Sequence, residues 1–442
     1  MARWLLPVAG VKLLACALFA LLAAVPRGAH AGGGDFQHAL VLGGGGEGDP
    51  RIYQHIVDLA GGPGKAKVGM ITAAADGGRH TAHWKAYERM FKSMGVEVHW
   101  LPVHDGAGEK AYDKDVVELA SQMNIVFFSG GSQNRLLRNV QDKQGRDTPL
   151  LAAIRKNFLA KKTIVVGSSA GTAAQAKGPV ITAGESYESL TRPSVPTVDI
   201  YNGNDLSYNQ RGGLGFFPWA VDTHFSERGR EGRFVRFAAE TGADLAFGID
   251  EGTAMFLLDP LDPAKRNLEV MGPGGVTIMD LTSARVDERD GWSIDDVELS
   301  HISEGDVFDP RTRTTRFARW KREVKKPASR RTLAHIAKLR HDVFGSPRQL
   351  EVDSEDPAVV SGTKDDSRVN LRVMRHLGFE IAGGAAERVD GTAWEPRAPR
   401  QRRISVRLER GAHAQAVEGK RRQSFRGVRM GVGVRAAAPR TR

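Results

Sequence analysis

The chain has 442 residues, enough for one large domain or two ordinary ones, and its 41% hydrophobic and 26% charged residues are typical of a soluble globular protein. The formal charge of +11 is concentrated at one end, because residues 384–442 contain 15 Lys and Arg against 5 Asp and Glu and so carry +10 of it. The rest of the chain is near neutral, and we expect no nucleic-acid partner for it.

The N-terminus has the pattern of a secretory signal. Arg3 and Lys12 supply positive charge, residues 13–25 form a short apolar run, and Ala29-His30-Ala31 is a small-residue cleavage site before Gly32. The pattern predicts a signal peptide at 1–31 and a secreted or periplasmic protein without membrane attachment after cleavage. An uncleaved anchor is the alternative.

Apolar runs and helical patterns alternate from about residue 37 to residue 250. This alternation predicts a mostly parallel sheet with helices on both faces, and ligands bind such sheets at the carboxyl ends of the strands. Thr148 and Pro149 predict the N-cap and first residue of one helix. Shorter strands at 254–258 and 276–279 indicate a mixed extension of the same sheet. The expected strands are 39–42, 67–71, 96–103, 125–128 and 164–166, with helical patterns at 52–60, 84–94 and 150–159.

The C-terminal third divides into two further segments. Residues 316–383 form an extension with one or two helices, one of them indicated by apolar residues spaced from Leu333 to Val343, followed by an acidic linker. Residues 384–442 are rich in Arg, Ala and Gly, and we expect a basic disordered tail. The domain with the chemistry is therefore expected at 32–315.

A buried strand meets a G-x-S-x-G sequence at Gly167–Gly171. This is the pattern of a nucleophile elbow, in which glycines make room for a sharp turn and the central serine, Ser169, is presented at the start of a helix. A tight strand–helix turn with incidental serines is the structural alternative.

Three other strand ends carry polar residues. Gly130-Gly131 precedes Ser132-Gln133, where adjacent glycines leave backbone N–H groups free for an oxyanion, although a glycine turn with a helix cap explains the same residues. His224 follows a strand and precedes Arg228, Arg230 and Arg233, which could hold a carboxylate or lie on a solvated helix face. Asp250-Glu251 ends another strand, where a carboxylate can orient a histidine or simply occupy a turn.

Together the four motifs resemble those of the cyanophycinases and the related aspartyl dipeptidases called peptidase E, in the same order over residues 37–310. The resemblance implies an α/β fold with a three-layer, mostly parallel sheet of the class I glutamine amidotransferase-like (flavodoxin-like) type. It implies no metal and no cofactor, and it leaves a homodimer open. The site residues implied are a Ser169–His224–Glu251 triad, an oxyanion hole from Gly131 and Ala170, and substrate contacts from Gln133, Asp222, Arg228, Arg230 and Arg233.

The resemblance implies a serine-type exopeptidase that cleaves cyanophycin, a multi-arginyl-poly-aspartate, into β-Asp-Arg dipeptides. Ser132, Thr223 and Gly252 depart from the family pattern near the expected substrate, so another aspartyl dipeptidase or peptidase is an alternative, as is an inactive amidotransferase-like binding protein. An esterase of the α/β-hydrolase type is disfavoured. Its histidine would follow the acid, and His301, the best candidate there, has no glycine turn.

Overall fold

A computed structural model supplies the coordinates. The expected signal peptide and the helix near Leu333–Val343 lie outside the described residues, and of the expected acidic linker at 353–366 the structure describes only the strand β19 (Val359–Gly362). The structure describes residues 35–46, 48–75, 82–289, 291–323, 351–352, 359–362, 389–394, 402–419 and 422–436.

The first sheet has nine strands in the order β16-β15-β11-β10-β1-β5-β4-β2-β3. The five from β1 to β3 in this order are mutually parallel, and the other four extend the sheet in antiparallel fashion. The strands are β1 (Ala39–Gly43), β2 (Lys67–Ile71), β3 (Glu97–Leu101), β4 (Ile125–Phe128), β5 (Ile164–Ser168), β10 (Ala254–Leu258), β11 (Asn267–Met271), β15 (Val307–Asp309) and β16 (Thr314–Arg316).

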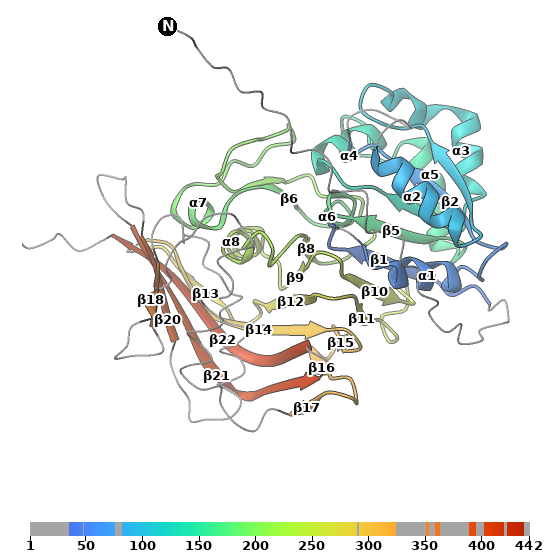
Figure 1. Ribbon diagram of the computed structural model, residues 1–442. Helices are drawn as coiled ribbons and strands as arrows, with labels where there is room; N and C mark the ends of the chain where they lie inside the picture. Colours follow the sequence, from blue (N-terminus) through green and yellow to red (C-terminus); the bar gives the residue numbers. More distant parts are fainter. Residues whose placement is uncertain are drawn as a thin grey trace, which may run out of the picture.

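Helices cover both faces of the parallel strands (Figure 1). Alternate residues of β1 show why, since Val41 packs with α1 and α2 side chains such as Ile56 and Phe91, whereas Leu42 packs with α5 residues such as Ile154. The three-layer α/β prediction is confirmed. These helices are α1 (Pro50–Leu59), α2 (Ala82–Ser93), η1 (Gly108–Tyr112), α3 (Lys114–Ser121), α4 (Gln133–Val140) and α5 (Pro149–Leu159).

Local sequence signals fix the ends of these helices. Thr148 caps α5, because its hydroxyl accepts a hydrogen bond from the Leu151 N–H at 3.4 Å, and Pro149 is the first helical residue, as predicted.

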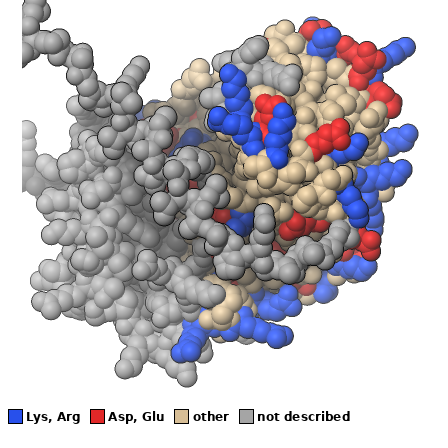
Figure 2. Space-filling view, turned by 45° about the vertical axis from the view of Figure 1, so that its right-hand side comes forward, with Lys and Arg blue, Asp and Glu red and all other residues tan. Residues whose placement is uncertain are grey.

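Basic and acidic side chains are interspersed over the face that comes forward in Figure 2. Among the described residues, no helix is both long enough and apolar enough to span a membrane.

A second sheet lies beside the first, in the order β18-β19-β20-β21-β22-β14-β12-β9-β8. Val276–Met279 belongs to it, so the prediction that these residues extend the first sheet is wrong. Its β12 pairs with β9 instead, because apolar side chains of α8, β9, β12 and β14 form a separate core there. The elements are β8 (Ala220–Asp222), α8 (Glu231–Thr241), β9 (Leu245–Ile249), β12 (Gly275–Asp280), β13 (Arg285–Asp287) and β14 (Ser293–Ser303).

The C-terminal residues differ from the disordered tail expected for 384–442. Phe425, Met430 and Val432 of β22 are buried against the second core, and β22 pairs antiparallel with β14. Apolar residues at alternate positions supply the signal, and the sequence interpretation missed it because Arg and Gly dominate the composition. The strands are β17 (Arg322–Glu323), β18 (Glu351–Val352), β19 (Val359–Gly362), β20 (Val389–Trp394), β21 (Arg402–Gly419) and β22 (Arg422–Ala436).

A buried ion pair ties β22 to the core. The side chains of Lys321 and Asp306 are fully buried and lie 2.6 Å apart. The Ser424 hydroxyl of β22 donates to Asp306 at 2.5 Å and accepts from Lys321 Nζ at 3.0 Å. Ser424 therefore bonds to both members of the buried ion pair, and without its hydroxyl each of them would lose a hydrogen-bond partner.

Candidate active site

The turn after β5 holds Ser169 in a strained conformation. Its φ of 54° and ψ of −118° lie outside the regions that L-residues prefer, and α6 (Ala170–Ala173) starts at the next residue. Gly171 permits the turn, since a Cβ there would lie 2.1 Å from the Phe128 carbonyl oxygen. The predicted elbow geometry is present, with the Ser169 side chain beside the carboxyl end of the sheet.

Two loops of the second sheet bring a histidine and a glutamate to this serine. His224 follows β8 and Glu251 follows β9. Ser169 Oγ lies 2.6 Å from His224 Nε2, and His224 Nδ1 lies 2.6 Å from Glu251 Oε1. The structure thus joins the three residues into one hydrogen-bonded series, in which an imidazole can take a hydroxyl proton while a carboxylate holds its tautomer.

The environment favours the neutral imidazole. Burial lowers the pKa of His224, and the positive charges of Arg228 and Arg230 lower it further, while the hydrogen bond to Glu251 opposes them. The net direction is below the ordinary value. A histidine held neutral in this way can accept a proton at neutral pH.

The turn after β4 lies directly beside the serine. A Cβ on Gly130 would lie 3.1 Å from Ser169 Cβ, and Gly131 has a φ of 143°. Ser132 caps α4 by accepting from the Arg135 N–H at 3.4 Å, so the helix cap expected as the bland interpretation is also present. Gln133 is buried and donates to the Ile181 carbonyl at 3.1 Å. The oxyanion roles of Gly131 and Ala170, and the substrate contact of Gln133, stay predictions.

Comparison with known proteins is consistent with this geometry. The family model for peptidase family S51 matches residues 39–260. The chain belongs to peptidase family S51. It is therefore a serine-type peptidase, and the match spans the strand ends that carry Ser169, His224 and Glu251.

Two cyanophycinases are similar in sequence to this chain. A cyanophycinase of Synechococcus elongatus is 32% identical over 256 residues, covering 56% of this chain and 70% of the relative. A cyanophycinase of a Nostoc species is 31% identical over 231 residues, covering 50% and 68%. Among solved structures, a peptidase from an acI-B1 Actinobacterium aligns with a TM-score of 0.43 at 18% identity, covering 62% of this chain and 96% of that one.

The arginines of this S51 peptidase are placed differently from one another. Asp222 is completely buried, and Arg233 donates to its two carboxylate oxygens at 2.8 and 2.9 Å. Burial raises the pKa of the Asp222 carboxyl, but Arg233 and Arg230 hold it below its ordinary value. The structure contradicts the prediction that Asp222 and Arg233 contact substrate, because each satisfies the other inside the protein.

Arg228 and Arg230 are more exposed than Arg233. Arg228 is exposed, while Arg230 donates to the Thr223 carbonyl at 2.7 Å and to Asp222 at 3.2 Å. The helix α8 starts only at Glu231, after a turn in which Gly229 has a φ of 56°. Substrate contact by Arg228 and Arg230 stays a prediction.

Two acidic residues, Asp250 and Glu227, support the site in roles that the sequence did not reveal. The buried Asp250 carboxylate accepts from the N–H groups of Ser226 and Gly275, both at 3.0 Å, and from the Ser226 hydroxyl. Glu227 accepts from the Glu251 N–H at 3.0 Å. The bonds from Ser226 to Asp250 and from Glu251 to Glu227 connect the loop of His224 with the loop of Glu251. The acidic pair Asp250-Glu251 was visible in the sequence, but no pattern there distinguishes a buried acid from a solvated one.

His301, the base that an esterase interpretation would need, lies elsewhere in the second sheet. It is buried on β14, and its Nδ1 lies 3.3 Å from the Thr277 hydroxyl.

A two-stranded sheet of β6 (Val180–Ala183) and β7 (Ser207–Asn209), with α7 (Ser186–Thr191) between them, borders α8. The hydroxyl of Ser186 accepts from the N–H groups of Gly232 and Arg233 and so fastens this segment to the start of α8.

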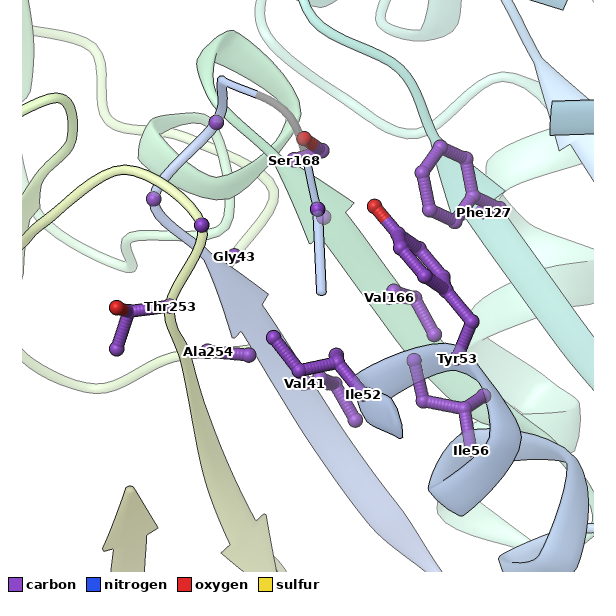
Figure 3. A pocket seen from close by; sticks show the side chains of 15 residues that line it. Val41, Gly43, Ile52, Tyr53, Ile56, Phe127, Val166, Ser168, Thr253 and Ala254 are labelled. Atoms are coloured by element: carbon purple, nitrogen blue, oxygen red, sulfur yellow. The ribbon is translucent and has the colours of Figure 1, made fainter. Parts of the chain in front are cut away.

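A small apolar pocket lies next to Ser168, the residue before Ser169. Tyr53 reaches from α1 with its hydroxyl toward the end of β5 (Figure 3), and the Tyr87 hydroxyl lies 3.5 Å from Ser168 Oγ. Phe127, Val166 and the glycines at the end of β1 complete much of the lining. The pocket therefore borders the loop after β1 on the α1 side.

Proposed function

We propose that this S51 peptidase hydrolyses cyanophycin to β-Asp-Arg dipeptides through a Ser169–His224–Glu251 triad. The observation that carries the proposal is the pair of 2.6 Å contacts that joins the three side chains at a strained elbow. The choice of cyanophycin as substrate is supported by the resemblance of the four motifs to those of the cyanophycinases and by the cyanophycinases among the relatives of this chain.

In the proposed reaction the Ser169 hydroxyl attacks a backbone amide carbonyl that follows an aspartyl residue. His224 accepts the hydroxyl proton and returns it to the leaving amine, while Glu251 stabilises the transient imidazolium. The N–H groups of Gly131 and Ala170 stabilise the oxyanion. Water then hydrolyses the acyl-enzyme, again with His224 as the base.

The cyanophycin repeat carries a free carboxylate and a guanidinium. We propose that the exposed Arg228 receives the carboxylate, supported by its place four residues after His224 and its Coulombic effect on that imidazole. Glu185 and Glu227, which are partly exposed, are the candidates for the guanidinium, because Asp222 is completely buried. Of these, Glu185 lies near Arg230, whose pKa burial and the charge of Arg233 lower to about 9, while the negative charges of Asp222 and Glu185 oppose the shift.

Secretion is part of the proposal and rests on the residues of the N-terminal signal alone. A signal peptide suits an enzyme whose insoluble polymer lies outside the cytoplasm. N-terminal sequencing of the protein from its native source should begin at or near Gly32. A retained Met1 would contradict it.

Incubation with cyanophycin granules tests the proposed function. The mature protein should release β-Asp-Arg, identified by mass spectrometry, and Ser169→Ala should release none above background. Aspartyl dipeptides serve as the competing substrate. If the aspartyl dipeptides are cleaved and the granules stay intact, the dipeptidase alternative replaces the cyanophycinase proposal. If neither substrate is cleaved, both functions are contradicted.

A further inference from the structure

The proposed triad leaves one glycine-rich motif unexplained, the run Gly43–Gly46 that follows β1. In the first sheet β1 pairs with β5 on one side and with β10 on the other. The strand β5 leads into Ser169, and β10 starts just after Glu251. The loop after β1 therefore leaves the sheet between the serine turn and the glutamate turn.

Main-chain hydrogen bonds connect this loop to all three catalytic turns. Three consecutive carbonyls of the loop each accept one hydrogen bond, one from each turn. The loop thus connects a turn of the first sheet with two turns of the second. Gly43 O accepts from Ser169 N–H (3.1 Å), Gly44 O from His224 N–H (2.8 Å) and Gly45 O from Gly252 N–H (2.8 Å), the residue after Glu251.

The missing side chains allow the close approach. Gly45 is buried with a φ of 88°, and a Cβ there would lie 2.4 Å from His224 Cε1 and 2.5 Å from Nε2. At Gly44 a Cβ would lie 1.9 Å from the Asp250 carbonyl oxygen. On the α1 side the loop borders the apolar pocket of Figure 3. Its closest packing is therefore against the catalytic turns.

We propose that Gly43–Gly46 is a positioning element of the active site, an inference that rests on the proposed triad. Its carbonyls set the main-chain positions from which Ser169, His224 and Glu251 extend, and its glycines leave the space that the imidazole needs. Since β8 and β9 belong to the second sheet, this loop fixes the separation of the nucleophile from its base. A displacement of about 1 Å there is enough to slow the reaction roughly a hundredfold.

Gly45→Ala tests the proposal, with Gly106→Ala as a matched control. Both glycines have a φ of 88°, but a Cβ at Gly106 would meet no atom within 4 Å. We expect Gly45→Ala to react with a fluorophosphonate at least a hundredfold more slowly than wild type and to lose the downfield NMR signal of the His224–Glu251 proton. Gly106→Ala should keep both. Both substitutions place alanine at the same positive φ. Equal losses of melting temperature in the two variants would therefore show that backbone strain does not cause the difference in reaction rate.

Two outcomes would overturn the positioning role. One is a Gly45→Ala protein that reacts within twofold of Gly106→Ala with the His224 proton signal unchanged. The other, where Gly45→Ala does not fold, is an unchanged reaction rate in Gly46→Ala, whose Cβ would lie 2.9 Å from Glu251 Cβ. Failure of the triad itself looks different, because wild type and Ser169→Ala would then react alike.

Discussion

The two sheets of this peptidase contribute in different ways to one site. The first sheet presents Ser169 from a parallel strand flanked by helices, in a turn that a local sequence pattern predicts. The second sheet, mostly antiparallel, presents His224 and Glu251 from the loops after β8 and β9. The nucleophile turn can therefore be predicted from a few consecutive residues, whereas its activation depends on how the two sheets are held together.

Removing the base should have the largest effect, because it removes the hydrogen bond that joins the nucleophile of the first sheet to the second sheet. His224→Ala should lower hydrolysis by about five to six orders of magnitude, because residues of a triad act as a unit. Turnover of an aspartyl substrate measures this, with thermal melting as the check on folding. His99→Ala is the control, since that side chain lies on β3 beside Glu97, and it should be as active as wild type.

Arg233→Met should destabilise the second sheet strongly. It leaves the completely buried Asp222 carboxylate without its main partner, and breaking such a pair costs about 3–5 kcal/mol of the free energy of unfolding. Urea denaturation measures the loss. Arg236→Met, one turn further along α8 in a less buried pair with Glu240, should lose about 1 kcal/mol. Equal losses in the two variants would contradict the importance assigned to the Asp222 pair.

The C-terminal strand offers a more moderate test. Ser424→Ala removes a hydroxyl that bonds to both members of the buried Lys321–Asp306 pair, and hydrogen bonds to charged groups contribute about 1.5–3 kcal/mol. Ser121→Ala, which removes a solvent-exposed hydrogen bond to the Glu118 carbonyl at the end of α3, should change stability by less than about 0.5 kcal/mol. A Ser424→Ala protein as stable as wild type would instead support the disordered tail expected from composition.

The smallest effect expected is a shift in pH dependence, measured as the position of the acid limb and not as the height of kcat/KM, which loss of the proposed carboxylate contact would also lower. Arg228→Gln removes a positive charge that lowers the pKa of His224, so the pKa should rise. Since the neutral imidazole is the active form, the acid limb of kcat/KM should then move to higher pH. A pH profile at low salt measures the shift, which added salt should reduce because Arg228 is exposed. Movement to lower pH would contradict the electrostatic account.

The difference between the sheets also explains what the sequence could predict. The parallel strands, the Thr148 cap and the elbow at Ser169 follow from signals within a few residues of each other. By contrast, β14 pairs with β22 across more than a hundred residues, and the ion pair of Asp222 with Arg233 needs a turn at Gly229 that periodicity does not reveal. Buried polar groups were therefore interpreted as substrate contacts when they are internal partners.

The central claim is that a nucleophile of the first sheet is activated by a base of the second. Peptide mapping after reaction with a fluorophosphonate tests it most directly. In wild type we expect one adduct, on Ser169, formed rapidly, and in His224→Ala no adduct on the same timescale. An adduct on Ser168 or another serine, or equally fast labelling of Ser169 without His224, would contradict the account.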